Sequence, residues 1–206
     1  MIGCLCTVIQ KLPFISNTIY SANCIILVRD DIVMTMEPLI VVADTSVLIN
    51  FLKLDRIDLI ARHPFSFLVT NHVSDEVTRH YASQRNRLKA ALEAGILQEH
   101  SVADEQDVAL FGKLSKDLGS GESSAIAFAS HRGYALAIDD GKAIKIARKV
   151  SKALKIFRTE DLLHSMIQEN LINTQEADAL KQELEIRHRF KMSFRSFADV
   201  KSGCSV

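Results

Sequence analysis

Hydrophobic residues along this chain occur in short continuous runs and in longer segments with helical spacing, and the two kinds alternate. Continuous apolar runs at 39–43 and 134–138 have the length and composition of strands buried on both faces. Shorter runs at 65–69 and 154–157 predict two further strands. Helical segments are predicted over 47–54, 55–61, 71–81, 84–95, 104–118, 122–131, 140–150, 159–170 and 174–189. This alternation predicts an α/β protein whose central parallel sheet carries helices on both faces.

Local signals predict several element boundaries. Asn71 and Thr159 are of the residue types that cap helix N-termini. The Gly-Ser-Gly run at 119–121 should separate two helices, so the second is expected to begin at Glu122. Residues 96–102 are too polar for a central strand and predict a short extended link.

The chain divides into three parts. Its 206 residues suit one domain with an appendage. Residues 1–36 lack a clear period, 37–173 hold the alternating pattern, and 174–206 form a last helix and a basic tail. Met34 and Met36 stand just before the first strong strand. One interpretation is a start assigned too early, and the other is an extension that covers a sheet edge.

Composition describes an ordinary globular protein. The formal net charge is zero and charged residues make up 24% of the chain, so the overall balance points to no particular partner. No stretch is long enough to span a bilayer, and the basic start and cleavage site of a signal peptide are missing. The cysteines have no zinc-like spacing, which favours reduced thiols and a cytoplasmic protein.

Acidic residues directly follow two of the apolar runs. Asp44 comes after 39–43, and the pair Asp139 and Asp140 comes after 134–138. Functional groups of parallel α/β sheets gather beyond the carboxyl ends of the strands, so these acids are expected at one edge. Each acid also has a simpler interpretation as a helix cap or a turn residue.

Two further acids lie beside apolar helical stripes. Glu76 is next to the stripe of Val73 and Val77, and Glu122 opens a helix along the face that contains Ala125. Burying a carboxylate is costly unless it is paired or binds a metal ion. A solvated position for Glu76 and an interaction with the helix dipole for Glu122 are the alternatives.

Together the acids predict a divalent metal site. Gathered carboxylates repel one another, and an oxygen-only ligand set suits Mg²⁺ or Mn²⁺ better than zinc. Such an ion activates water and stabilises phosphoryl oxygens. The expected reaction is therefore hydrolysis of a phosphodiester.

The order of these motifs resembles a PIN domain over roughly 41–172. The segments that carry the resemblance are Asp44-Thr45-Ser46, Val73-Ser74-Asp75-Glu76-Val77, Gly119-Ser120-Gly121-Glu122-Ser123-Ser124-Ala125-Ile126-Ala127, Ala137-Ile138-Asp139-Asp140-Gly141-Lys142-Ala143 and Thr159-Glu160-Asp161-Leu162-Leu163. The third of these segments is similar to that of the small prokaryotic PIN proteins, among them the VapC-like toxins of toxin–antitoxin pairs.

This resemblance implies a Rossmann-like PIN fold and a Mg²⁺- or Mn²⁺-dependent ribonuclease. By position, Asp44, Glu76, Glu122 and Asp139 would form the acidic site, with Asp140 replacing or assisting Asp139. The metal ligands would be Asp44, Glu122 and Asp139. The implied partners are an RNA substrate, an antitoxin chain and a second copy in a homodimer. The N-terminal stretch has no counterpart in the small toxins.

Basic residues follow the acidic turn. Lys142, Lys145, Arg148 and Lys149 are candidate RNA contacts, because cations bind phosphates without sequence preference. A solvated helix face is the alternative. In the tail, three phenylalanines at 190, 194 and 197 favour a core or dimer contact over base stacking or an antitoxin-binding surface.

Other functions have less support from the sequence. A phosphatase of the haloacid dehalogenase type would want a second aspartate two residues after Asp44, where Ser46 stands. A dinucleotide-binding module would need a third glycine at Ser124 and a strand before the glycine run. A PIN-like module that binds RNA or protein without cutting is the main non-enzymatic alternative.

Overall fold

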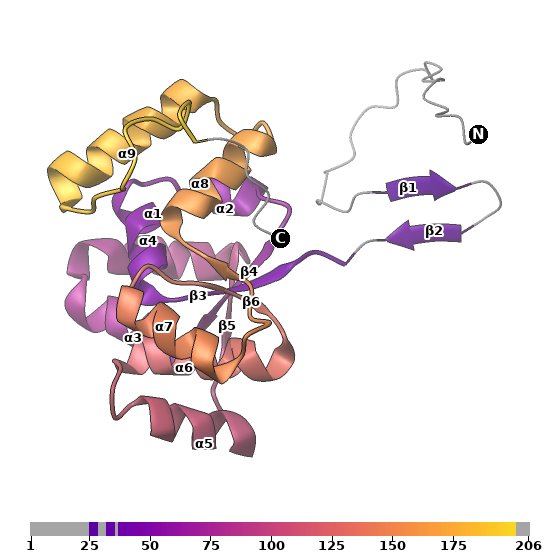
Figure 1. Ribbon diagram of the computed structural model, residues 1–206, viewed down its shortest axis with the longest axis vertical. Helices are drawn as coiled ribbons and strands as arrows, with labels where there is room; N and C mark the ends of the chain where they lie inside the picture. Colours follow the sequence, from indigo (N-terminus) through magenta and orange to yellow (C-terminus); the bar gives the residue numbers. More distant parts are fainter. Residues whose placement is uncertain (1–24, 29–31, 36, 201–206) are drawn as a thin grey trace.

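A five-stranded parallel sheet forms the centre of the protein, as seen in the computed structural model, which describes residues 25–28, 32–35 and 37–200 (Figure 1). The strand order is β5-β4-β3-β6-β7, and every neighbouring pair is parallel. The strands are β3 (Ile40–Ala43), β4 (Ser66–Thr70), β5 (Leu97–His100), β6 (Ala135–Ala137) and β7 (Ile156–Phe157). The predicted α/β class and parallel sheet are therefore confirmed.

The chain order of the strands reverses at β3. From β3 the chain adds β4 and then β5 on one side, and it then returns to add β6 and β7 on the other side. β6 pairs directly with β3, and the Asp44 backbone N–H donates to the Ala137 carbonyl at 2.9 Å. Ligands of open α/β sheets bind at such a reversal, beyond the carboxyl ends of the two strands.

Helices cover both faces of the sheet. They are α1 (Thr45–Lys53), α2 (Ile57–Arg62), α3 (Asn71–His80), α4 (Ala82–Glu93), α5 (Glu105–Leu114), α6 (Ser120–Arg132), α7 (Gly141–Val150), α8 (Thr159–Gln168) and α9 (Thr174–His188). Successive strand residues point to opposite faces, so Val41 and Ala43 join one buried cluster while Val42 joins the other. The first cluster takes α1–α4, α8 and α9, and the second takes α5–α7.

Most predicted elements are present, with one additional strand and three differences at the starts of helices. Residues 97–100 form the edge strand β5, where a link was expected, because backbone pairing with β4 tolerates polar side chains at an edge. Thr70 caps α3 in place of Asn71, whose side chain accepts from the Val102 N–H at 3.3 Å instead. α6 begins at Ser120, so Gly121 lies inside the helix. Arg158 is the N-cap of α8, and the predicted cap Thr159 is its first helical residue.

The two ends of the chain differ from the central domain. Strands β1 (Ile25–Val28) and β2 (Ile32–Thr35) pair antiparallel with each other and form a separate two-stranded sheet. The rest of the predicted extension, with Cys4, Cys6 and Cys24, lies outside the described residues, and so does Cys204 at the other end of the chain. In the tail, Phe197 is buried and Phe190 and Phe194 pack against the first buried cluster, as the prediction of a core contact required.

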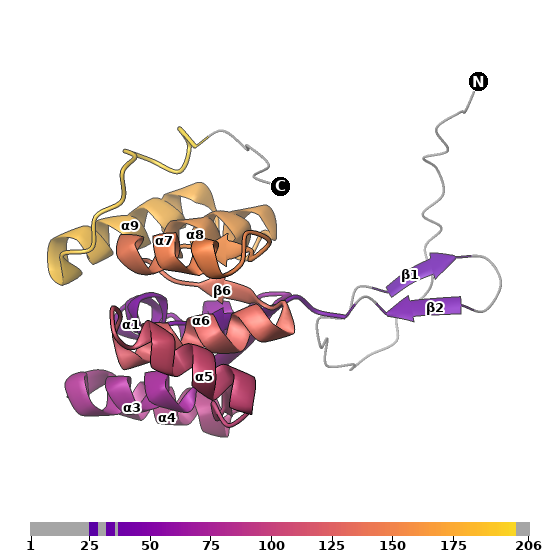
Figure 2. The ribbon, with the colours of Figure 1, turned by 60° about the horizontal axis from the view of Figure 1, so that its bottom comes forward.

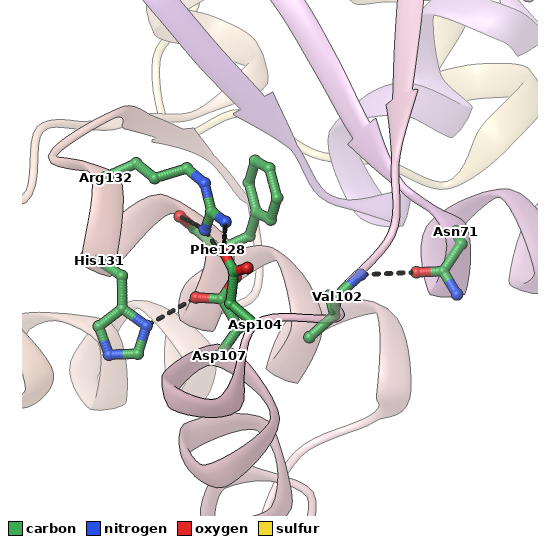
Figure 3. Close-up of polar contacts among 7 residues, drawn as sticks. All are labelled: Asn71, Val102, Asp104, Asp107, Phe128, His131 and Arg132. Carbon is green, nitrogen blue, oxygen red and sulfur yellow. Dashed lines mark hydrogen bonds and ion pairs between the residues drawn. The ribbon is translucent and has the colours of Figure 1, made fainter.

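Helices α5 and α6 lie side by side, as Figures 1 and 2 show, and an ion-pair network joins them. Asp107 on α5 is 1% exposed and accepts from Arg132 at 2.6 Å and from His131 at 2.7 Å (Figure 3). Arg132 also contacts Asp104 and lies 3.8 Å from the centre of the Phe128 ring. Both oxygens of the buried Asp107 carboxylate are paired with residues of α6, which marks the network as structural support for this helix pair. None of the helices within the described ranges is long and apolar enough to cross a membrane.

Candidate functional site

Asp44 stands at the carboxyl end of β3, where the apolar run predicted it. It is the N-cap of α1, and its Oδ2 accepts from the Ser46 N–H at 3.1 Å and from the Ser46 hydroxyl at 2.8 Å. Its side chain is buried, and Oδ1 has no hydrogen-bond partner. Burial raises the pKa of Asp44 to about 6, the Ser46 hydrogen bonds oppose that rise, and the charge of Glu122 adds to it.

Gly121 brings a second carboxylate to Asp44. Its lack of a side chain leaves a small space, because a Cβ there would overlap Oε2 of Glu76. The same Cβ would lie 2.8 Å from Thr45 Oγ1 and 3.4 Å from Asp44 Oδ1. Three oxygens from α1, α3 and the end of β3 therefore surround one point beside α6. The Thr45 hydroxyl, like Asp44 Oδ1, is buried without a partner.

Glu122 lies next to this group but bonds elsewhere. Its Oε2 accepts from the Gly119 backbone N–H at 3.0 Å and so caps the first turn of α6. The interaction with the helix N-terminus that sequence offered as an alternative is thus present. Glu122 is nevertheless close enough for its charge to raise the pKa of Asp44.

Asp139 follows β6 and is held by residues distant in sequence. Its Oδ1 accepts from the Thr159 N–H at 2.8 Å, and its Oδ2 accepts from the Thr159 hydroxyl at 2.6 Å and from the Asn50 amide at 3.2 Å. Its own N–H donates to the Ser46 hydroxyl at 3.0 Å. Ser46 therefore joins Asp139 to Asp44. Burial raises the pKa of Asp139, against the lowering effect of these hydrogen bonds.

Asp140 has a different role from its neighbour. It is exposed and caps α7, with Oδ1 accepting from the Ala143 N–H at 2.7 Å. Lys142, Lys145, Arg148 and Lys149 are all exposed along α7, and the Lys142 ammonium reaches the Asp117 carbonyl. The geometry separates the two aspartates of the turn: Asp139 is joined to Asp44 through Ser46, and Asp140 caps the N-terminus of α7.

Three residues near the acids were not predicted as site residues, although Arg158 is one of the basic residues that follow the acidic turn and Glu160 lies in a segment that carries the resemblance. Asn50 is buried and donates to both Asp139 and Thr159. Arg158 and Glu160 form an ion pair on either side of Thr159, with Nη1 and Oε1 2.6 Å apart. A single amide within the apolar run 47–52 was the available signal for Asn50, whereas nothing local distinguished the ion pair.

Two of the acids, Asp44 and Glu76, place an oxygen around the same point beside Gly121. Within 25–28, 32–35 and 37–200, no three His, Cys, Asp or Glu side chains are grouped closely enough to hold a metal ion as they stand. Asp44 and Glu76 share the space beside Gly121, while Glu122 and Asp139 are held by hydrogen bonds to other residues.

The burial of Asp44 predicts a pH-dependent stability difference. Its pKa of about 6 in the folded protein exceeds the ordinary value of 3.8, so folding is penalised progressively as pH rises from about 4 to about 6. In EDTA, the Asp44→Asn variant should therefore become more stable than the parent by about 3 kcal/mol over that range, and the gap should stay constant above it. Urea unfolding of both proteins from pH 4.5 to 7.5 covers the upper part of this titration, over which the gap should widen by about 2 kcal/mol.

The contributions of other titrating groups to stability cancel in the difference between the two proteins. Burial lowers the pKa of His63 to about 4, which changes stability with pH in the opposite direction, but equally in both proteins. A gap that is the same at pH 4.5 and pH 7.5 would contradict the prediction.

Comparison with known families agrees with this geometry. A family model for the PIN domain matches residues 40–200. That segment begins at the first residue of β3 and includes all five parallel strands and all the acids described above. No curated protein matches the chain. PIN domains are generally nucleases, so the fold is of a nuclease type. Because the match covers far more than half of the 206 residues, the chain belongs to the PIN-domain family.

Proposed function

We propose that this protein is a metal-dependent ribonuclease that hydrolyses RNA phosphodiesters at the carboxyl edge of β3 and β6. The observation that carries the proposal is the group of oxygens from Asp44, Glu76 and Thr45 around Gly121. Two of these oxygens are buried without a partner, and such groups are costly unless a ligand completes them. Membership of the PIN family supports the same conclusion.

The donor set fits Mg²⁺ or Mn²⁺, since it consists of carboxylate and hydroxyl oxygens. Asp44 and Glu76 would hold the ion, with Glu122 and Asp139 flanking them. When bound, the ion would polarise a phosphoryl oxygen and lower the pKa of a bound water. A Cβ at position 121 would fill the space between these oxygens, which is a reason for glycine there.

The chain prepares these carboxylates for a cation. Ser46 holds Oδ2 of Asp44 and leaves Oδ1 free, which orients the carboxylate. Burial raises the pKa of Asp44, so the ionised form gains more from a neighbouring cation than an exposed aspartate would. Thr159 and Asn50 keep Asp139 in place from the other side of the β3–β6 junction.

RNA would be held by the basic face of α7. This helix begins at the acidic turn, and Lys142, Lys145, Arg148 and Lys149 are exposed along it. Phosphate contacts by such residues supply affinity without sequence specificity. The proposal therefore includes an RNA substrate bound chiefly through its backbone.

The proposal extends to the toxin of a toxin–antitoxin pair. Its support is the resemblance of residues 119–127 to the small prokaryotic PIN proteins. An antitoxin chain and a homodimer are the partners that this role would bring.

Glu76 and its neighbour Asp75 provide a matched test of the proposed activity. Glu76 faces Gly121, whereas Asp75 is exposed and pairs with Arg79 at 3.5 Å on the surface. With Mn²⁺ or Mg²⁺, the parent and Asp75→Asn should cleave a mixed RNA pool at similar rates. Glu76→Gln should cleave about 10²-fold more slowly or worse, because a ligand oxygen is lost. EDTA should stop cleavage by all three proteins.

The same experiment separates the alternatives. Cleavage that survives EDTA, or equal rates for Glu76→Gln and Asp75→Asn, would refute a metal-dependent site at Gly121. A folded parent that binds RNA and never cuts it would indicate a non-catalytic PIN-like module instead. Raised thermal stability on adding Mn²⁺ to the parent, absent in Glu76→Gln, would report metal binding without relying on activity.

A further inference from the structure

Arg158 occupies a position from which it can reach a substrate at the acidic edge. It follows β7 directly and is the N-cap of α8. The next residue, Thr159, donates both its N–H and its hydroxyl to Asp139. The guanidinium is thus on the residue adjacent to the one that holds Asp139, at the carboxyl edge where β3 and β6 also end.

We propose that Arg158 binds a phosphate of the RNA strand beside the acidic site. In the absence of RNA, Glu160 pairs with Arg158, and the phosphate replaces Glu160 when RNA binds. This inference rests on the proposed ribonuclease function and adds to it a substrate contact and a competing anion. It concerns one phosphodiester group of a single strand, recognised by its charge and its two free oxygens.

The pair is incomplete as it stands. Arg158 Nη1 donates to Glu160 Oε1 at 2.6 Å, which is one contact where a guanidinium and a carboxylate can make two. Arg158 Nε and Glu160 Oε2 are both buried and have no hydrogen-bond partner. Leaving a buried donor unpaired is costly, so Arg158 gains a hydrogen bond if its guanidinium turns away from Glu160 toward another anionic oxygen.

Comparison with Arg132 shows what a purely structural arginine looks like in this protein. Arg132 contacts Asp107, Asp104 and the Phe128 carbonyl, and its guanidinium lies over the Phe128 ring (Figure 3). Its side chain is 24% exposed, whereas that of Arg158 is 41% exposed and makes one ion pair. Arg158 therefore retains both solvent access and unused donors.

Glu160 competes with the phosphate for this arginine. Its side chain is 14% exposed, and the carboxylates of Asp139 and Asp161 are close enough to act on it. When Arg158 turns to a phosphate, Glu160 loses its cation in a region that is already acidic. Its removal should consequently strengthen RNA binding, and removal of Arg158 should weaken it.

Binding of a labelled single-stranded RNA of about 12 nucleotides, measured by fluorescence anisotropy in EDTA, tests the pair without any cleavage. Arg158→Gln should bind about 10-fold more weakly than the full-length parent, and the slope of log affinity against log salt should fall by about one. Glu160→Gln should bind several-fold more tightly than the parent. The double variant should bind as Arg158→Gln does.

Opposite changes of RNA affinity in Arg158→Gln and Glu160→Gln distinguish this inference from a structural ion pair. Loss of a structural pair would lower the melting temperature in both single variants and shift RNA affinity in the same direction in both. If Arg158→Gln does not fold, Arg158→Lys replaces it, because it keeps the charge and loses the fork, and binding should weaken less than 10-fold. Unchanged affinity and salt slope on loss of Arg158, no tightening in Glu160→Gln, or a parent that binds no RNA would each overturn the inference. Cleavage activity of the parent is measured separately and tests the proposed ribonuclease function independently of the binding experiment.

Discussion

Replacing Asp44 by asparagine is expected to abolish RNA cleavage while leaving the protein folded and more stable than the parent at pH 7.5. The carboxylate contributes the unpartnered Oδ1 beside Glu76, and the amide would supply neither its charge nor an equivalent ligand. The bound ion is expected to stabilise the transition state by several kcal/mol. Loss of this ligand should therefore lower the cleavage rate by about 10³-fold or more. Cleavage of a mixed RNA pool with Mn²⁺ or Mg²⁺ measures it.

The stability of Asp44→Asn should rise although its activity falls. Asparagine is a good N-cap and can still accept from the Ser46 N–H, so α1 should keep its start. The variant no longer buries a charge, and in the absence of metal it should unfold at a higher temperature. Loss of activity together with loss of folding would point to a structural role. Activity within tenfold of the parent would refute the assignment of Asp44 to the site.

Replacing Asp107 by asparagine should cause the largest loss of stability among the acids of this protein. Asp107 is buried and pairs with both Arg132 and His131, so its loss leaves Nη1 of Arg132 with the Phe128 carbonyl as its remaining partner and no buried anion. Breaking a buried pair at one partner typically costs several kcal/mol, and about 3 kcal/mol is expected here. For a chain of this length the melting temperature should fall by about 6–12 °C.

Asp104 provides the matched control, because it contacts the same arginine from the surface. Its side chain is 70% exposed, and exposed pairs contribute less than about 1 kcal/mol. Thermal unfolding of Asp107→Asn and Asp104→Asn should therefore give clearly different melting temperatures. Equal melting temperatures would show that the α5–α6 pair does not depend on the buried aspartate. RNA cleavage under stable conditions should be similar in both, since the network contains none of the proposed site residues.

Local patterns in the sequence were sufficient for the fold class and for two acids. The apolar runs that end at Asp44 and Asp139 predicted buried parallel strands, and the sheet places both residues at the β3–β6 junction. This works because a strand buried on both faces has few polar positions, so the residue that ends the run is visible without any tertiary information. Glu76 and Glu122 were located from their positions beside apolar helical stripes.

Other features depended on contacts that no local pattern reports. Residues 97–100 pair with β4 although their side chains are mostly polar and exposed, because the hydrogen bonds belong to the backbone. The Gly-Ser-Gly run at 119–121 was expected to end a helix, yet Gly121 lies in α6 and makes room for Glu76. Glycine is unfavourable within a helix, but the close approach of Glu76 and Thr45 to position 121 requires a residue without a side chain.

The sequence by itself determined that this protein has an α/β parallel sheet, where the two apolar strands β3 and β6 lie, and which acids follow them. Only the tertiary structure decided that Asp44 meets Glu76, that Asp140 caps α7, and that Asn50 holds Asp139 from 89 residues away. The physical reason is the range of the interactions. Periodic burial and capping are properties of a few consecutive residues, whereas a site is formed by side chains whose separation is set by how helices pack on the sheet.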